Sequence, residues 1–236
     1  MQNVKSMTLS ALALLVLAGA AQAAPWSSGN LIVLELGPNQ NAGSANLNSV
    51  AHAVTLREFD RLASVFTGNN LGINSGANGT RLTMAASATS EGQMNLSENG
   101  QYLTFAGYDA AQGTPGGAPG SSIAISTVAN VNRVVGRVDI NQSVQLSKIT
   151  DAYSTNNLRS ATSRDGSTFA MTASNGGVRA LDPSAGTTTT LISSTPTTNN
   201  RVARYDADMG AKRLFVSAAS GTIQGVAEVI AGVITP

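Results

Sequence analysis

Carboxylates, amides and arginines are the side chains in this sequence that are best able to do chemistry. Asp139 and Asn141 lie two positions apart, and so do Asp206 and Asp208. Residues two apart on a strand face the same side, and calcium takes several oxygen ligands from carboxylates and Asn side chains. These four residues are therefore candidate calcium ligands. The same residue types also cap their own backbone in turns, and the sequence has no complete D-x-D-x-D-G calcium loop.

Three arginines form a second candidate site. Arg81, Arg159 and Arg201 each fall at or near the start of the first strand of a repeated module, as described below. If these strands surround one opening, their guanidinium groups would suit a carboxylate or phosphate ligand. The alternative is that each is a solvated arginine at a strand end.

The sequence supplies no recognisable catalytic centre. His52 is the only histidine, so a Ser-His-Asp triad would have to include it, and no G-x-S-x-G motif occurs. The lack of cysteine and the single histidine exclude zinc sites built from these residues. We expect His52 to be an ordinary strand-edge or loop residue, and no catalytic residue is assigned.

The amino-terminal residues 1–23 have the pattern of a bacterial export signal. Lys5 is followed by an apolar run and by the small-residue site Ala21-Gln22-Ala23, and cleavage there would leave Ala24 as the first residue. The run is shorter than the roughly 20 residues that span a bilayer. We therefore expect a secreted or periplasmic protein with no membrane span after processing. Its net charge of +1 provides no basic surface for nucleic acid.

Short strands separated by turns must position these residues. Residues 156–193 contain four expected strands, and Asp165-Gly166 and Asn175-Gly176 separate the first three. These dipeptides are strong hairpin signals because both residue types tolerate positive φ. A four-stranded antiparallel sheet of about 40 residues is the size of one β-propeller blade. The strands are expected at 158–163, 168–174, 178–182 and 187–193.

Other segments give clear expectations. Residues 30–37 form a continuous apolar run, which predicts a strand buried on both faces. Residues 122–128 are also predicted to form a strand. The segments rich in Gly with Asn or Pro, 68–80 and 109–121, are predicted to be loops.

The predicted modules repeat along the chain. SENGQYLTFAG in the second module matches SRDGSTFAMTA in the third, and Asn156-Asn157-Leu158-Arg159 recurs as Asn199-Asn200-Arg201-Val202. The repeats define modules at about 24–80, 81–150, 151–196 and 197–236, each burying its sheet against its neighbours. The alternative is a β-sandwich with similar hairpins.

These motifs, together with GGVRALDPSAG and VNRVVGRVD, resemble exported bacterial β-propeller-like repeat proteins, which are largely uncharacterised. The resemblance implies an all-β, propeller-like array of four-stranded antiparallel blades. This chain would hold about three and a half blades. The array is then incomplete, or it closes by pairing with another chain.

Three functions are compatible with this sequence. The first is an exported binding or scaffold protein whose loops face an extracellular or envelope ligand, and the missing catalytic motifs favour it. The second is a calcium-dependent hydrolase of the propeller lactonase or esterase type. The third is a non-catalytic fragment that associates with itself through an exposed sheet edge.

Overall fold

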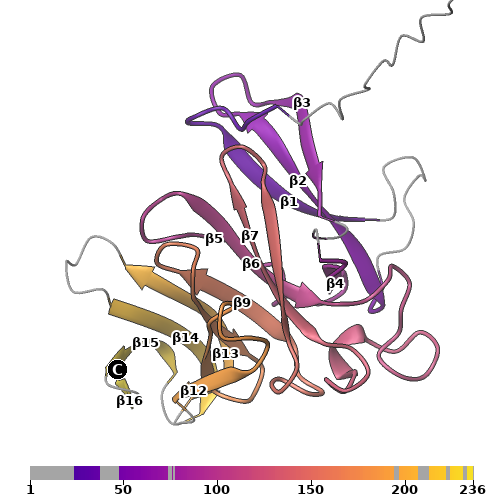
Figure 1. Ribbon diagram of the computed structural model, residues 1–236, viewed down its shortest axis with the longest axis vertical. Helices are drawn as coiled ribbons and strands as arrows, with labels where there is room; N and C mark the ends of the chain where they lie inside the picture. Colours follow the sequence, from indigo (N-terminus) through magenta and orange to yellow (C-terminus); the bar gives the residue numbers. More distant parts are fainter. Residues whose placement is uncertain are drawn as a thin grey trace, which may run out of the picture.

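The computed structural model describes residues 24–37, 48–73, 76, 78–193, 197–206, 213–221, 224–230 and 233–235. The expected export signal at 1–23 and the candidate ligand Asp208 lie outside these residues. Within them the fold is all-β, with three antiparallel sheets that do not close (Figure 1). No helix in these ranges is long and apolar enough to cross a membrane.

The largest sheet contains eight strands from the first part of the chain. β2 (Ala51–Asp60) pairs with β1 (Leu31–Gly37) along one edge and with β3 (Val65–Gly72) and β4 (Thr83–Ala85) along the other. β4 then pairs with β6 (Tyr102–Tyr108), which also pairs with the short β5 (Asn95–Leu96). β7 (Arg133–Asp139) and β8 (Val144–Ile149) complete the sheet.

Three expectations for this region are wrong. β1 is not buried on both faces, because exposed residues such as Leu31 and Val33 alternate with partly buried ones. The inward-facing residues of β1 pack on the core around Leu56 and Phe105, and its other face is exposed. Part of the predicted loop at 68–80 belongs to β3, which extends the β2 hairpin. The predicted strand at 122–128 is instead a 3₁₀ turn, η1 (Ile123–Ile125).

The long Gly/Pro loop at 109–121 is a loop, as predicted, and it is attached to the sheet. The amide of Ala51 donates to the carbonyl of Thr114 at 2.9 Å, and the amide of Gly113 donates to the carbonyl of Ala51 at 2.8 Å. These bonds hold the loop against the start of β2.

The four strands predicted in residues 156–193 are confirmed. β9 (Leu158–Ser163), β10 (Phe169–Ala173), β11 (Val178–Leu181) and β12 (Thr189–Ser193) form one sheet in the order β12-β11-β10-β9. Gly166 and Gly176 have φ angles of +82° and +95°, the left-handed conformation for which glycine is suited.

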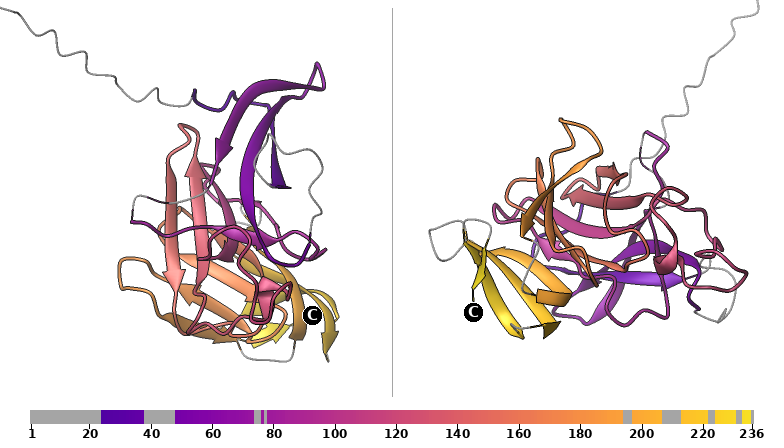
Figure 2. Two further views of the ribbon diagram at one scale, coloured as in Figure 1. Left: turned by 90° about the vertical axis from the view of Figure 1, so that its right-hand side faces the viewer. Right: turned by 90° about the horizontal axis from the view of Figure 1, so that it is seen from below.

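The third sheet lies at the opposite end of the molecule from β1, β2 and β3, as Figure 1 and the left view of Figure 2 show. It is built from β13 (Thr197–Asp206), β14 (Arg213–Gly221), β15 (Gly225–Ile230) and β16 (Val233–Thr235), in that order.

β9 joins the three sheets, and all six of its residues are buried. On one side, the Asn95 side chain donates to the carbonyl of Ala161 at 2.8 Å, and the Thr104 hydroxyl donates to the same oxygen at 2.9 Å. On the other side, the hydroxyl of Ser160 accepts from the amide of Ala203 in β13 at 3.1 Å. Polar contacts thus connect β5 and β6 to β9, and β9 to β13.

Candidate functional site

A carboxyl group, that of Glu91, lies near Arg133 and Arg159 beside the start of β9. Glu91 lies in the loop between β4 and β5. Its Oε1 accepts a 2.6 Å hydrogen bond from the Tyr108 hydroxyl, and its Oε2 accepts from the Ala85 amide at 3.0 Å. The backbone of Leu158 also hydrogen-bonds to Tyr108, so the start of β9 lies beside this pair.

The acidity of Glu91 is strongly changed by these surroundings. Burial of its carboxyl group raises the pKa to about 7, although the bonds from Tyr108 and Ala85 and the charges of Arg133 and Arg159 act in the opposite direction. Burial and the neighbouring Glu91 likewise raise the pKa of Tyr108 well above its usual value. Glu91 therefore changes its charge near neutral pH, while Tyr108 remains a hydrogen-bond donor.

Arg133, at the start of β7, is the largest fully buried side chain of this centre. It donates to the carbonyls of Val131 at 2.7 Å and Ser126 at 2.8 Å, and its guanidinium lies 4.9 Å from the centre of the Tyr108 ring. A third carbonyl, that of Ala124 in η1, accepts at 3.3 Å. Three backbone carbonyl oxygens thus solvate the buried charge, which indicates a structural role for Arg133.

Arg159 and Arg201, two of the three predicted arginines, lie close together. Nη1 of Arg159 donates to the side-chain oxygen of Asn199 and to the carbonyl of Asn200 at 2.9 Å, and Arg201 follows directly in the chain. Burial and the charge of Arg201 lower the pKa of Arg159. The third arginine, Arg81, is half exposed and pairs with Asp109 instead.

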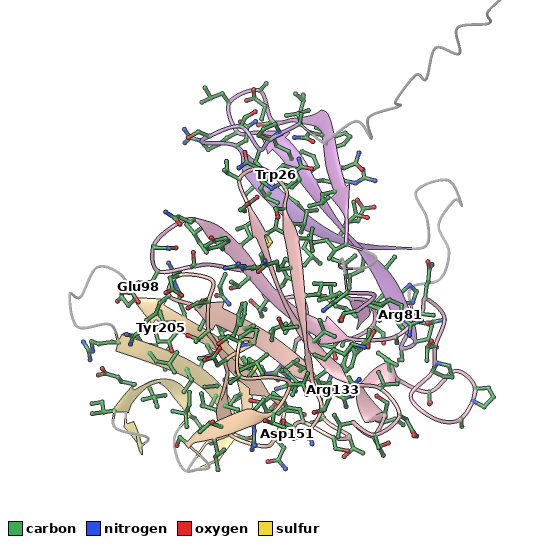
Figure 3. The ribbon with its side chains drawn as sticks, viewed as in Figure 1. Trp26, Arg81, Glu98, Arg133, Asp151 and Tyr205 are labelled. Carbon is green, nitrogen blue, oxygen red and sulfur yellow. The ribbon has the colours of Figure 1, made fainter. Side chains whose placement is uncertain are left out.

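Figure 3 shows Arg81 beside β4, at a distance from the third sheet. The Arg81 backbone amide donates to Asp109 at 2.9 Å, and Lys148 reaches the same carboxylate at 2.9 Å. The structure therefore brings Arg159 and Arg201 together and places Arg81 in a separate ion-pair network.

The predicted calcium ligands have local partners. Oδ1 of Asp139 accepts from the amides of Asn141 and Ser143, each at 2.9 Å, which is the turn geometry considered as the alternative. Asp206 ends β13, opposite Arg213 on β14. Within the described ranges, no three His, Cys, Asp or Glu residues come together as metal ligands.

His52 lies in β2 and is 6% exposed. Its Nε2 is 3.0 Å from Oδ1 of Asn48, and burial lowers its pKa. No described Ser or Thr hydroxyl forms a hydrogen bond with its ring, so the described contacts do not form a triad.

A groove of about 870 Å³ forms a second feature, lined by residues of β1, β5, β6 and β7 and of the segment before β1. Its walls include three exposed apolar side chains, Leu31, Leu96 and Ile140, which are 56%, 53% and 51% exposed. Trp26, the only tryptophan, also lines the groove and is 7% exposed. Its indole nitrogen has no acceptor among the described residues.

The segment that contains Trp26 is fixed by hydrogen bonds to β2 and to the turn after β7. The buried Glu58 on β2 accepts from the Ser27 amide at 2.6 Å and from the Asn30 side chain at 3.1 Å. The Trp26 amide donates to the carbonyl of Ile140 at 2.8 Å, after the end of β7. Figure 3 shows Trp26 between the β7–β8 hairpin and the strands β1 and β2. This wall of the groove is therefore preformed.

Sequence reasoning missed Glu91, Tyr108, Arg133 and the groove. Glu91 precedes a glycine and had only a turn signal, because its burial depends on β6 and β9, which are distant in sequence. Arg133 is one of several arginines that begin a strand, so no local pattern distinguishes a buried one from a solvated one. The groove could not be expected once β1 was taken to be buried on both faces.

No protein-family model matches this sequence, and no curated protein is significantly similar to it. The site must therefore be interpreted from its own geometry.

Proposed function

We propose that this chain is an exported binding protein that holds an extracellular or envelope ligand in the groove next to Trp26. The observation that carries the proposal is a groove of about 870 Å³ whose walls present exposed Leu31, Leu96 and Ile140. Binding clefts for small ligands are typically about 300–1,000 Å³, mostly apolar, with a few polar groups that fix orientation.

The lining of the groove defines the chemistry of the ligand. Apolar side chains form most of the contact surface, and Gln101 and Asp139 add polar groups. The nearby carboxylate of Glu58 is occupied by Ser27 and Asn30 and does not line the groove. A neutral, largely apolar ligand with one or two hydrogen-bond acceptors fits this lining best.

The proposal includes the architecture and the location. We take the β9–β12 and β13–β16 sheets to be successive blades of a propeller-like array, because each is a four-stranded antiparallel meander and β9 packs beside β13. Residues 1–23 would direct export, with the processed chain beginning at Ala24. The carbonyl of Ala24 accepts from Gln142 at 2.6 Å, which would hold the new terminus near the groove.

The test is a titration with Nile red, a neutral apolar dye that brightens when it leaves water. Wild-type protein should bind it saturably, and Leu96→Asp should weaken binding about tenfold, because a carboxylate in the wall must be desolvated by an apolar ligand. Leu96 is 53% exposed, so this substitution should leave the fold intact.

Leu62→Asp is the matched control, because Leu62 is 87% exposed and does not line the groove. It should bind the dye like the wild type. Equal binding by wild type and Leu96→Asp, or an equal loss in both variants, would show that the groove is not the binding site.

A further inference from the structure

Arg159 has an unused hydrogen-bonding edge. Its Nη1 binds the side chain of Asn199 and the carbonyl of Asn200, whereas its Nε is buried and has no acceptor in the described part of the chain. No described group accepts from Nη2 either. The Nε–Nη2 edge of an arginine presents two parallel N–H groups, the arrangement that binds both oxygens of a carboxylate or two oxygens of a phosphate.

Asn200 provides a second unsatisfied polar group at the same place. Its side chain is 0% exposed, and neither Oδ1 nor Nδ2 has a partner among the described residues. Buried amides almost always form hydrogen bonds, so the two unpartnered atoms beside Arg159 point to an additional group. The Nδ2 atom can donate to an anion, as the Arg159 edge can.

The charges around this point do not balance. Arg201 is half-buried and forms no hydrogen bond or ion pair with the described residues, and its charge acts directly on Arg159. Glu91 is the carboxyl group whose charge acts on Arg159, and its two oxygens already accept from Tyr108 and Ala85. Two neighbouring cations, one of them buried, therefore lack a counter-charge that is hydrogen-bonded to them.

The backbone of β13 is irregular at this position. Asn199 has a φ angle of +54°, and the pairing of β13 with β14 shifts between Asn200 and Ala203. A bulge of this kind re-aims side chains relative to a regular strand. Here the side chain of Asn199 and the carbonyl of Asn200 contact the Arg159 guanidinium, and Arg201 follows in the chain.

We propose that Arg159, Asn200 and Arg201 form a binding site for a small oxyanion of the carboxylate or phosphate type. Arg159 binds two of its oxygens through Nε and Nη2, the Asn200 amide donates a third bond, and Arg201 supplies the second positive charge. The site shares no residue with the groove beside Trp26, so it goes beyond the binding function proposed above.

The test uses the whole chain and three sodium salts, acetate, phosphate and chloride, at matched ionic strength and pH 7. Acetate or phosphate should raise the melting temperature saturably, because a ligand that binds only the folded state stabilises it by mass action. Chloride, which lacks the paired oxygens, should have a smaller effect. In a ¹⁵N NMR spectrum, the side-chain Nε–H signal of Arg159 should shift along the same saturation curve.

Arg201→Gln should weaken binding at least about tenfold, as expected when one charged contact is lost. Arg204→Gln is the control, since Arg204 lies on the same strand and is exposed; it should bind like the wild type. Equal losses in the two variants, equal effects of all three salts, or an effect that never saturates would overturn the proposal and assign the unpaired atoms to water. Nile red binding should be unchanged in Arg201→Gln, which separates this test from that of the groove.

Discussion

Glu91→Gln should remove a pH dependence of stability that the wild-type protein shows between pH 5 and pH 8. The pKa of Glu91 is about 7 in the folded chain and near 4.5 in an unfolded one. Because the folded state binds this proton more tightly, its contribution to the free energy of unfolding is fully present below pH 4.5. It is lost as the pH rises through 7. Between pH 5 and pH 8 the loss amounts to about 2.5 kcal/mol.

The assay is urea unfolding at pH 5, 6, 7 and 8, followed by circular dichroism for both proteins. The wild-type curve alone does not isolate the Glu91 contribution, because His52 also titrates in this range. Burial lowers the pKa of folded His52, so the unfolded state gains this proton first. Stability is then lost as the pH falls below about 6.5. The difference between wild type and Glu91→Gln removes this opposing contribution. That difference should change by about 2.5 kcal/mol over the range, in favour of the wild type at low pH.

A second variant locates the effect at the Glu91 carboxyl group. Tyr108→Phe removes the hydroxyl that donates to Glu91 at 2.6 Å and so helps to stabilise the ionised form. The pH midpoint of the Glu91 contribution should then move upward. If wild type and Glu91→Gln have parallel pH profiles, Glu91 is not desolvated as the structure indicates, and the reasoning is refuted.

Two further substitutions test a close contact and a turn. Gly136→Ala should destabilise the fold by about 1–3 kcal/mol in urea unfolding, because the added Cβ would lie 2.3 Å from the ring of Phe105. An unchanged urea midpoint would contradict this. Asp139→Ala should cost about 1 kcal/mol through the lost bonds from the amides of Asn141 and Ser143, equally with and without calcium. A calcium-dependent stabilisation of the wild type that this variant lacks would favour the metal-ligand interpretation instead.

The sequence predicted the fold best where turn chemistry is local. The strands β9 to β12 were placed closely because Asp165-Gly166 and Asn175-Gly176 mark hairpins by their own conformational preferences. The predictions were wrong where contacts between distant segments decide the burial or the conformation of a segment. The apolar run of β1 has one face covered and one exposed, and the apolar alternation after Ser122 ends in a 3₁₀ turn.

The candidate site was predictable only in part, for the same reason. Arg81, Arg159 and Arg201 were predicted from their positions near the start of a module's first strand, and the structure brings the last two together. Arg81 lies apart from them, because it pairs with Asp109, which also binds Lys148. The raised pKa of Glu91 follows from its desolvation by distant strands, which no local pattern records.

The low aromatic content of this chain explains why polar groups lie so close to its centre. Only 4% of its residues are aromatic, and at β9 the sheets are joined by small polar side chains, such as Ser160 and Thr104, that bond across to neighbouring backbone. Such a seam fixes strand positions through directional bonds, in addition to the apolar clusters that also join the sheets. The guanidinium of Arg159 lies in this seam and donates to the carbonyl of Asn200. An oxyanion bound there would complete this polar seam, so the proposed anion site follows from the way the sheets are joined.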